Sequence, residues 1–333
     1  MASAPAQTVE STEIKSVLVT GATGFVGRAV VRALLARGYH PVCVVRSPHK
    51  LLRLFPDVDA DRLTTIPGDL ADAAALRHGA DLSQAAIHLV GIIVARPMRR
   101  QTFDRIHTQG TVNVVDAVLR AGIRRYVHMS ALGARPDAIS KYHQTKWAAE
   151  HYVRGCDLDW TIFRPSLIHG PDGEFIRLMK RFMCSFFPPI IPYFGQGDAK
   201  IQPVSVKDVA HCLVESLTKN ETIGETYPLG GPQTYSWRSF YNTCRALMPG
   251  SKSFKPMVSL PVALAKFNAI VGGPIMGIIE TVAPPMSLFR FDVGQVQMSQ
   301  EDSVCDHTIA EKTFGIQMRT FEDELAAYAD QIK

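Results

Sequence analysis

The stretch VLVTGATGFVGR, residues 17–28, decides the fold of this chain. An apolar run long enough for a buried strand stops at Gly21, and glycines recur at Gly24 and Gly27 before a helical pattern begins. Gly21 allows unusual backbone dihedral angles, Gly24 lets a ligand approach the backbone, and Gly27 lets helix and strand pack closely. The N–H groups and the positive dipole end of the helix would then face a pyrophosphate.

This order of strand, glycine turn and helix predicts a nucleotide-binding turn. Its spacing is GxxGxxG rather than GxGxxG, and a turn that holds no ligand is the alternative interpretation. We expect the nucleotide to contact Gly21, Thr23, Gly24, Phe25, Val26 and Gly27.

The composition is that of an ordinary globular protein, with 46% hydrophobic and 20% charged residues in a chain of 333. The net charge of +5 is spread along the chain, and Arg96, Arg99 and Arg100 are its only tight basic cluster, so we expect no nucleic-acid partner. Six cysteines occur singly, without spacing suited to a metal site, and favour free thiols in a reducing, cytoplasmic compartment. Residues 1–14 are expected to form a flexible tail.

Strand and helix patterns alternate from residue 17 onward, which predicts right-handed βαβ units and a parallel sheet. We therefore expect an α/β fold, a Rossmann-type doubly wound parallel sheet with a smaller C-terminal substrate or lid lobe. Residues 15–170 would form the NAD(P)-binding core. Within 171–333, about 200–230 would return to the core, and about 171–199 and 231–333 would form the lobe. The expected strands are 17–20, 41–46, 63–66, 86–91, 124–129 and 160–163.

The end of the second strand indicates which dinucleotide is bound. A carboxylate there would bind the ribose 2′-hydroxyl of NAD, whereas an arginine accommodates the 2′-phosphate of NADP. The chain has Arg46 and no carboxylate, which favours NADP(H) over NAD(H), with Arg46 as the phosphate clamp. A solvated arginine at a strand end is the alternative. After the third strand, Asp69 either accepts a hydrogen bond from the adenine amino group or caps a helix that begins at Ala71.

The fourth strand carries His88 among apolar residues, and a histidine in that setting is expected to be a core residue rather than a catalytic one. The strand is closed by Gly91, which we expect beneath the cofactor ribose. Pro165 lies in the segment that leads out of the sixth strand, and its carbonyl and fixed shape would position the nicotinamide end.

Tyr142 and Lys146 are four residues apart on an expected helix and therefore project from one face. A neighbouring ammonium would lower the pKa of a phenol from its ordinary value near 10, so that Tyr142 could exchange a proton with a substrate oxygen. Lys146 would also bind the nicotinamide ribose. Ser130 lies at the end of the fifth strand, where its hydroxyl could bind the same substrate oxygen.

Taken together, these motifs resemble those of the extended or atypical short-chain dehydrogenase/reductases, which include NAD-dependent epimerase/dehydratase-like proteins. The match covers the first half of the chain. Within that superfamily the chain is similar to the group containing the NADPH-binding accessory subunit of respiratory complex I and its bacterial relatives. The resemblance implies catalytic roles for Ser130, Tyr142 and Lys146 and further cofactor contacts at Leu70, Leu89 and Pro165.

Two departures from the superfamily pattern are visible. Most extended members have an Asn-containing turn after the fourth strand, where this chain has LVG at 89–91. Ser130 precedes Ala131 and Leu132 rather than a second hydroxyl residue, which puts the third catalytic role in doubt.

The second half combines basic, aromatic and aliphatic residues. The segment 175–182 is a basic amphipathic helix, and an aromatic and proline-rich run follows over 186–194. These features suit either a packed substrate lobe or contact with a membrane surface or a lipid-like substrate. The apolar stretch 260–289 is interrupted by prolines and charges, so we expect a lid or an interfacial segment rather than a membrane span.

Three functions remain open at this point. The first is an NADP(H)-dependent oxidoreductase acting on a carbonyl, alcohol or double bond of a small apolar or lipid-like substrate. The second is a non-catalytic, NADPH-stabilised accessory or assembly protein of a membrane respiratory complex, in peripheral contact with the membrane. The third is a sugar-nucleotide epimerase or dehydratase, although no uridine-phosphate clamp is visible.

Overall fold

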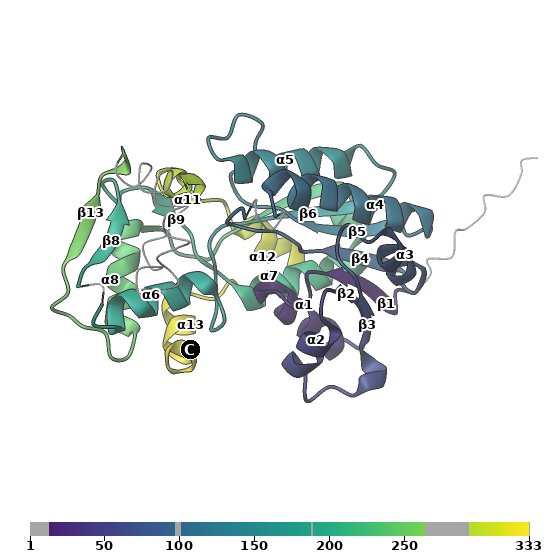
Figure 1. Cartoon of the computed structure of the whole chain (residues 1–333), viewed down its shortest axis with the longest axis horizontal. Helices are drawn as coiled ribbons and strands as arrows, with labels where there is room; N and C mark the ends of the chain where they lie inside the picture. Colours follow the sequence, from purple (N-terminus) through teal and green to yellow (C-terminus); the bar gives the residue numbers. More distant parts are fainter. Residues whose placement is uncertain (1–12, 97–100, 188, 264–292, 333) are drawn as a thin grey trace, which may run out of the picture.

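The computed structural model describes residues 13–96, 101–187, 189–263 and 293–332. Seven parallel strands form one sheet in the order β11-β6-β5-β4-β1-β2-β3 (Figure 1). The order reverses between β1 and β4, and ligands of such sheets bind at the carboxyl ends of the strands beside that point. The expected Rossmann-type sheet is confirmed. Its strands are β1 (Ser16–Thr20), β2 (His40–Val45), β3 (Thr64–Pro67), β4 (Ala85–His88), β5 (Arg125–Met129), β6 (Asp159–Pro165) and β11 (Glu225–Leu229).

Helices cover both faces of this sheet, which is why its strands are apolar at successive positions. Val17 and Val19 of β1 lie in the apolar cluster on one face and Leu18 in the cluster on the other, all three fully buried. The first face carries α1 (Phe25–Ala36), α7 (Val206–Glu215) and α12 (Thr308–Phe314). The second carries α3 (Ala73–Asp81), α4 (Gly110–Arg120) and α5 (Lys141–Arg154).

Two elements begin differently from the sequence prediction. The helix expected from Ala71 begins at Ala73, because the Asp72 side chain caps it by accepting the N–H of Ala75 at 3.0 Å. Apolar residues at helical spacing over 103–119 predict a regular helix, but this segment starts with a wider turn, a π-helix over Asp104–Gln109, before α4. Such turns are frequent at functional sites.

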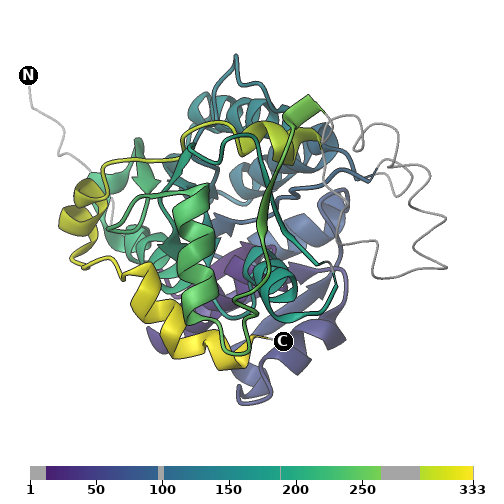
Figure 2. The same cartoon turned by 90° about the vertical axis from the view of Figure 1, so that its left-hand side faces the viewer.

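A further apolar cluster, called the second cluster to distinguish it from the core of the sheet, lies beyond the carboxyl ends of the strands (Figures 1 and 2). It is centred on Phe182, Phe240 and Phe321, which are at most 1% exposed. Its elements are α6 (Glu174–Cys184), β8 (Ile191–Phe194), α8 (Trp237–Leu247), β13 (Met257–Leu260) and α13 (Phe321–Tyr328). The strands β8 and β13 pair in parallel.

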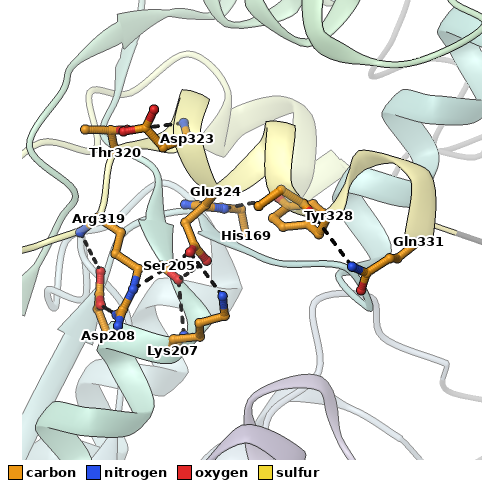
Figure 3. Close-up of polar contacts among 11 residues, drawn as sticks. His169, Ser205, Lys207, Asp208, Arg319, Thr320, Asp323, Glu324, Tyr328 and Gln331 are labelled. Atoms are coloured by element: carbon orange, nitrogen blue, oxygen red, sulfur yellow. Dashed lines mark hydrogen bonds and ion pairs between the residues drawn. The ribbon is translucent and has the colours of Figure 1, made fainter.

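The last helix ties this second cluster to the core (Figure 3). Asp208, in the first turn of α7, is fully buried and forms an ion pair with Arg319, just before α13. Glu324 of α13 accepts hydrogen bonds from Ser205 and Lys207, both at 3.1 Å. The C-terminal segment thus holds the start of α7 through Arg319 and Glu324.

Most of the apolar stretch 260–289 lies outside the described residues. Within the described ranges, no helix has the length and apolar character that a membrane crossing requires. The same ranges contain no cluster of three or more His, Cys, Asp or Glu residues able to hold a metal ion.

Candidate functional site

The glycine turn after β1 has the geometry that its sequence predicts. Gly21 has a φ of 84°, in the region that favours glycine. Its carbonyl accepts the N–H of Gly24 at 2.9 Å. A Cβ atom on Gly27 would lie 2.1 Å from the Gly21 carbonyl oxygen and 2.8 Å from the Cα of Ala22. Only glycine at position 27 therefore lets α1 pack on the turn.

The N-terminus of α1 is open to an anion. Its capping residue is Gly24, which has no side chain to bond the first N–H groups, and the first turn carries no acidic residue. Uncapped N–H groups with the dipole behind them suit a pyrophosphate. Thr23 is half-buried in the turn, whereas the Val26 side chain lies in the core, so only its backbone can face a ligand.

The end of β2 presents Arg46 to solvent. Its side chain is exposed and has no hydrogen-bond or ion-pair partner among the described residues. A free guanidinium at this position suits a 2′-phosphate. The neighbouring Ser47 is otherwise engaged, because its hydroxyl caps a short helix, α2 (Pro48–Leu54), by accepting the N–H of Lys50.

Asp69 is exposed after β3, and one of its carboxylate oxygens accepts the N–H of Ala71 at 2.7 Å. Asp72 is the residue that caps the helix, so the expectation that Asp69 does so is wrong. Leu70 lies beside it, and its carbonyl accepts the side-chain amide of Asn113 in α4 at 2.7 Å.

Lys146 lies at the carboxyl ends of β4 and β5. The residue is 2% exposed, and its ammonium donates to the Met129 carbonyl at 3.0 Å. Burial lowers the pKa of Lys146 to about 8, against the opposing effect of Glu150. A Cβ on Gly91 would lie 3.1 Å from the Lys146 ammonium. Glycine at 91 therefore leaves room beside the charge, as a ribose would require.

Tyr142 is half-buried on the same helix. Its ring packs edge-on against Phe103, His107 and His143, with centroids 5.2 to 6.2 Å away. Burial raises the pKa of Tyr142 to about 12. This direction is opposite to the one expected from the sequence, because the Lys146 ammonium points to the Met129 carbonyl instead of the phenol. Tyr142 keeps its proton through neutral pH and suits the role of proton donor.

Ser130 lies directly after β5 and is 2% exposed. Its backbone N–H donates to the Phe163 carbonyl at 2.7 Å, while its buried hydroxyl has no partner among the described residues. The same holds for both ring nitrogens of His128 and for the hydroxyl of Tyr126, at alternate positions of the strand. Buried polar groups without partners are rare, and of these three residues Ser130 is the one that lies beyond the end of the strand.

His107 is a site residue that sequence reasoning missed. The wide turn before α4 carries it inward, where one ring nitrogen accepts the N–H of Ile92 at 3.0 Å and the other contacts the Thr145 hydroxyl at 2.9 Å. Burial first, and the charge of Lys146 second, lower the pKa of His107 to about 2. Nothing in the local pattern distinguishes this wide turn from a regular helix.

His88 is the core histidine that the sequence predicts. Its two ring nitrogens contact the hydroxyls of Thr20 at 2.6 Å and Thr111 at 3.2 Å, and it is 1% exposed. Two backbone groups near the turn are also engaged. The Leu89 N–H donates to the Thr20 carbonyl at 3.2 Å, and the Pro165 carbonyl accepts the N–H of Leu132 at 2.9 Å.

The pKa of Lys146 leads to a testable pH dependence. If its ammonium binds the nicotinamide ribose, NADPH affinity should stay level up to pH about 8 and fall by up to tenfold per pH unit above it, as the proton is lost. The free energy of unfolding should rise between pH about 8 and 10.5, because in this range Lys146 is protonated in the unfolded chain and has lost its proton in the folded chain. Fluorescence titration over that range checks the first effect. A Lys146→Met variant should bind more weakly at pH 7 and show no such fall, and a wild-type affinity independent of pH would contradict the assignment.

Comparison with known proteins places the site in context. A family model described as NAD(P)H-binding matches residues 21–220. A ceramide reductase from Caulobacter vibrioides is 36% identical over 201 residues, which cover 60% of this chain but only 59% of that protein. The mitochondrial NADH-ubiquinone oxidoreductase 40 kDa subunit from Neurospora crassa is 26% identical over 270 residues, covering 79% of this chain and 68% of the subunit.

Among solved structures, the UDP-glucose 4-epimerase of Thermotoga maritima superposes with a TM-score of 0.70 over 95% of this chain and 98% of the epimerase. At 18% identity this likeness concerns the fold alone. The resemblance to the group containing the complex I subunit is confirmed by the Neurospora relative, and the epimerase confirms the fold alone.

Proposed function

The chain belongs to the family of NAD(P)H-binding proteins, and on that premise we propose that it is an NADP(H)-dependent reductase of a carbonyl group on an apolar, lipid-like substrate. The observation that supports this proposal is that the Lys146 ammonium donates to the carbonyl of Met129, the residue before Ser130 at the end of β5, while Tyr142 lies one turn earlier on the helix of Lys146. A proton donor, a buried cation and a buried hydroxyl without a partner among the described residues suit the reduction of a carbonyl.

The preference for NADP(H) rests on the end of β2. The exposed, unpaired guanidinium of Arg46 would bind the 2′-phosphate, and no carboxylate is present there for the 2′-hydroxyl of NAD. The glycine turn and the uncapped N-terminus of α1 would bind the pyrophosphate. Gly91 and Lys146 would take the ribose.

The chemistry needs one hydride and one proton. The bound nicotinamide would supply the hydride to the carbonyl carbon. Tyr142 would give its phenolic proton to the carbonyl oxygen, and Ser130 would donate a hydrogen bond to the same oxygen. The phenolate left behind would take a proton back from water. Because burial raises the pKa of Tyr142, the phenol keeps its proton at neutral pH, which is the form that carbonyl reduction requires.

A lipid-like substrate is supported by the relative named ceramide reductase. A second candidate, an accessory subunit that binds NADPH without turnover, is favoured by the complex I relatives and by one structural fact. No hydrogen bond links the Lys146 ammonium to Tyr142; the ammonium donates to the Met129 carbonyl instead. The two candidates predict different outcomes once NADPH is bound.

The experiment that separates them is NADPH oxidation against a panel of carbonyl compounds. We expect consumption of NADPH with long-chain keto-lipids in detergent micelles and little or none with short ketones of the same head structure. Stoichiometric NADPH binding without oxidation by any member of the panel, together with co-purification of membrane-complex subunits, would contradict the reductase and support the accessory subunit.

A further inference from the structure

Two phenylalanine rings protrude together from the second cluster. Phe186 is 84% exposed and Phe254 is 74% exposed. The ammonium of Lys252 lies 3.9 Å from the centroid of the Phe186 ring and 6.0 Å from that of Phe254. We call these three side chains the aromatic tip. Single exposed apolar residues are ordinary, but two large rings gathered around one cation form a patch that requires an explanation.

The aromatic tip rests on a firm support. The backbone N–H of Lys252 donates to the Met183 carbonyl at 2.9 Å, at the end of α6. Lys255 is 1% exposed, and its ammonium donates to the carbonyls of Phe182 and Ser185, which the helix end leaves unpaired. These bonds hold the loop of Phe254 against the helix end that precedes Phe186, so the two rings are presented side by side.

The two sequence segments that contain the aromatic tip are basic. Residues 175–197 and 226–263 together contain seven Lys or Arg and no Asp or Glu. The rest of the chain contains the other 29 of its 36 basic residues and all 31 of its acidic residues. Arg177 and Arg181 of α6 form no ion pair among the described residues. An anionic surface is the complement of this end of the molecule.

The aromatic tip is distinct from the nucleotide turn. A Cβ added to Gly173, the capping residue before α6, would lie 3.4 Å from the Phe25 ring at the nucleotide turn. The 11 residues of α6 extend about 16 Å from that point, at 1.5 Å per residue. β8, β13 and α8 lie at the opposite end of the molecule from the seven-stranded sheet (Figure 1).

We propose that the aromatic tip docks the protein on a bilayer that contains anionic lipids. Phe186 and Phe254 enter the boundary between headgroups and acyl chains, and Lys252 with the neighbouring arginines contacts the headgroup phosphates. Exposed rings gain apolar burial there, and lysine can place its stem in the boundary while its ammonium stays with the headgroups. The inference goes beyond the proposed function, since nucleotide binding and proton donation do not require it.

Vesicle sedimentation of the full chain tests this proposal. Binding is expected to vesicles of phosphatidylcholine mixed with phosphatidylglycerol, weak or absent with phosphatidylcholine alone, and weakened by added salt. The double variant Phe186→Ser, Phe254→Ser should bind at least about tenfold more weakly, because both apolar contacts are lost. The matched control is the double variant Leu52→Ser, Ile139→Ser, which changes two aliphatic residues on the surface of the nucleotide-binding part of the chain. These residues are 45% and 60% exposed, and the control variant should bind vesicles as wild type does.

NADPH binding and the unfolding midpoint are measured on every variant, so that loss of fold or of the nucleotide site is recognised separately. Wild-type protein that binds NADPH but no anionic vesicle would overturn the proposal. So would a phenylalanine double variant that binds vesicles as tightly as wild type. Concentration-dependent dimers that disappear in that variant, without vesicle binding by wild type, would assign the patch to contacts between copies of the chain.

Discussion

Replacing Gly27 by alanine should raise the Kd for NADPH by at least about 100-fold and lower the free energy of unfolding by roughly 1–3 kcal/mol. The new Cβ would lie 2.1 Å from the Gly21 carbonyl oxygen and 2.8 Å from the Cα of Ala22, and backbone cannot rotate away as a side chain can. The turn must open, which displaces the N–H groups at the start of α1 from the pyrophosphate. Calorimetric titration and urea unfolding measure the two effects.

The matched control is Gly38→Ala at the other end of α1. Gly38 has a φ of 81° and nothing within 4 Å of an added Cβ, so alanine costs about 1–2 kcal/mol of backbone strain without steric contact. This variant should lose stability but keep its NADPH affinity. A folded Gly27→Ala variant with wild-type affinity would show that the nucleotide does not depend on the turn.

Replacing Tyr142 by phenylalanine should lower kcat for carbonyl reduction by about 10²–10⁴-fold and leave the Kd for NADPH within a factor of about two. The change removes the only proton that the phenol can give and retains the ring, which packs against Phe103 and His107. Steady-state NADPH oxidation with an active keto-lipid measures kcat, and titration measures Kd.

Tyr152→Phe is the control on the same helix. The Tyr152 hydroxyl donates to Asp116 at 3.0 Å and lies away from the strand ends, so kcat should not change. Equal kcat in Tyr142→Phe and wild type would remove Tyr142 from the mechanism while leaving nucleotide binding intact.

The fold was predictable because its determinants are local. Continuous apolar runs such as 17–19 indicate strands buried on both faces, and the glycine spacing identifies the turn that Gly21 and Gly27 form. The alternation of strand and helix then predicts right-handed βαβ units and a parallel sheet. Neither step needs information about distant contacts.

The electrostatics of the site were not predictable, because they depend on contacts between elements. The spacing correctly places Tyr142 and Lys146 on one helix. The Lys146 ammonium, however, donates to the Met129 carbonyl at the end of β5, and burial raises the pKa of the Tyr142 phenol. The wide turn that brings His107 inward has no residue pattern of its own. Asp72 rather than Asp69 caps α3, because the helix begins at Ala73 and not at Ala71.

The most direct test of the account is a paired titration of the purified chain with NADPH and NADH. The account predicts tighter binding of NADPH by about 10–100-fold, the usual contribution of a hydrogen bond to a charged group. Arg46→Ala should remove that difference and leave the NADH affinity unchanged. Failure to bind either dinucleotide, or tighter binding of NADH by the wild-type chain, would contradict a 2′-phosphate at Arg46 and a dinucleotide across the glycine turn.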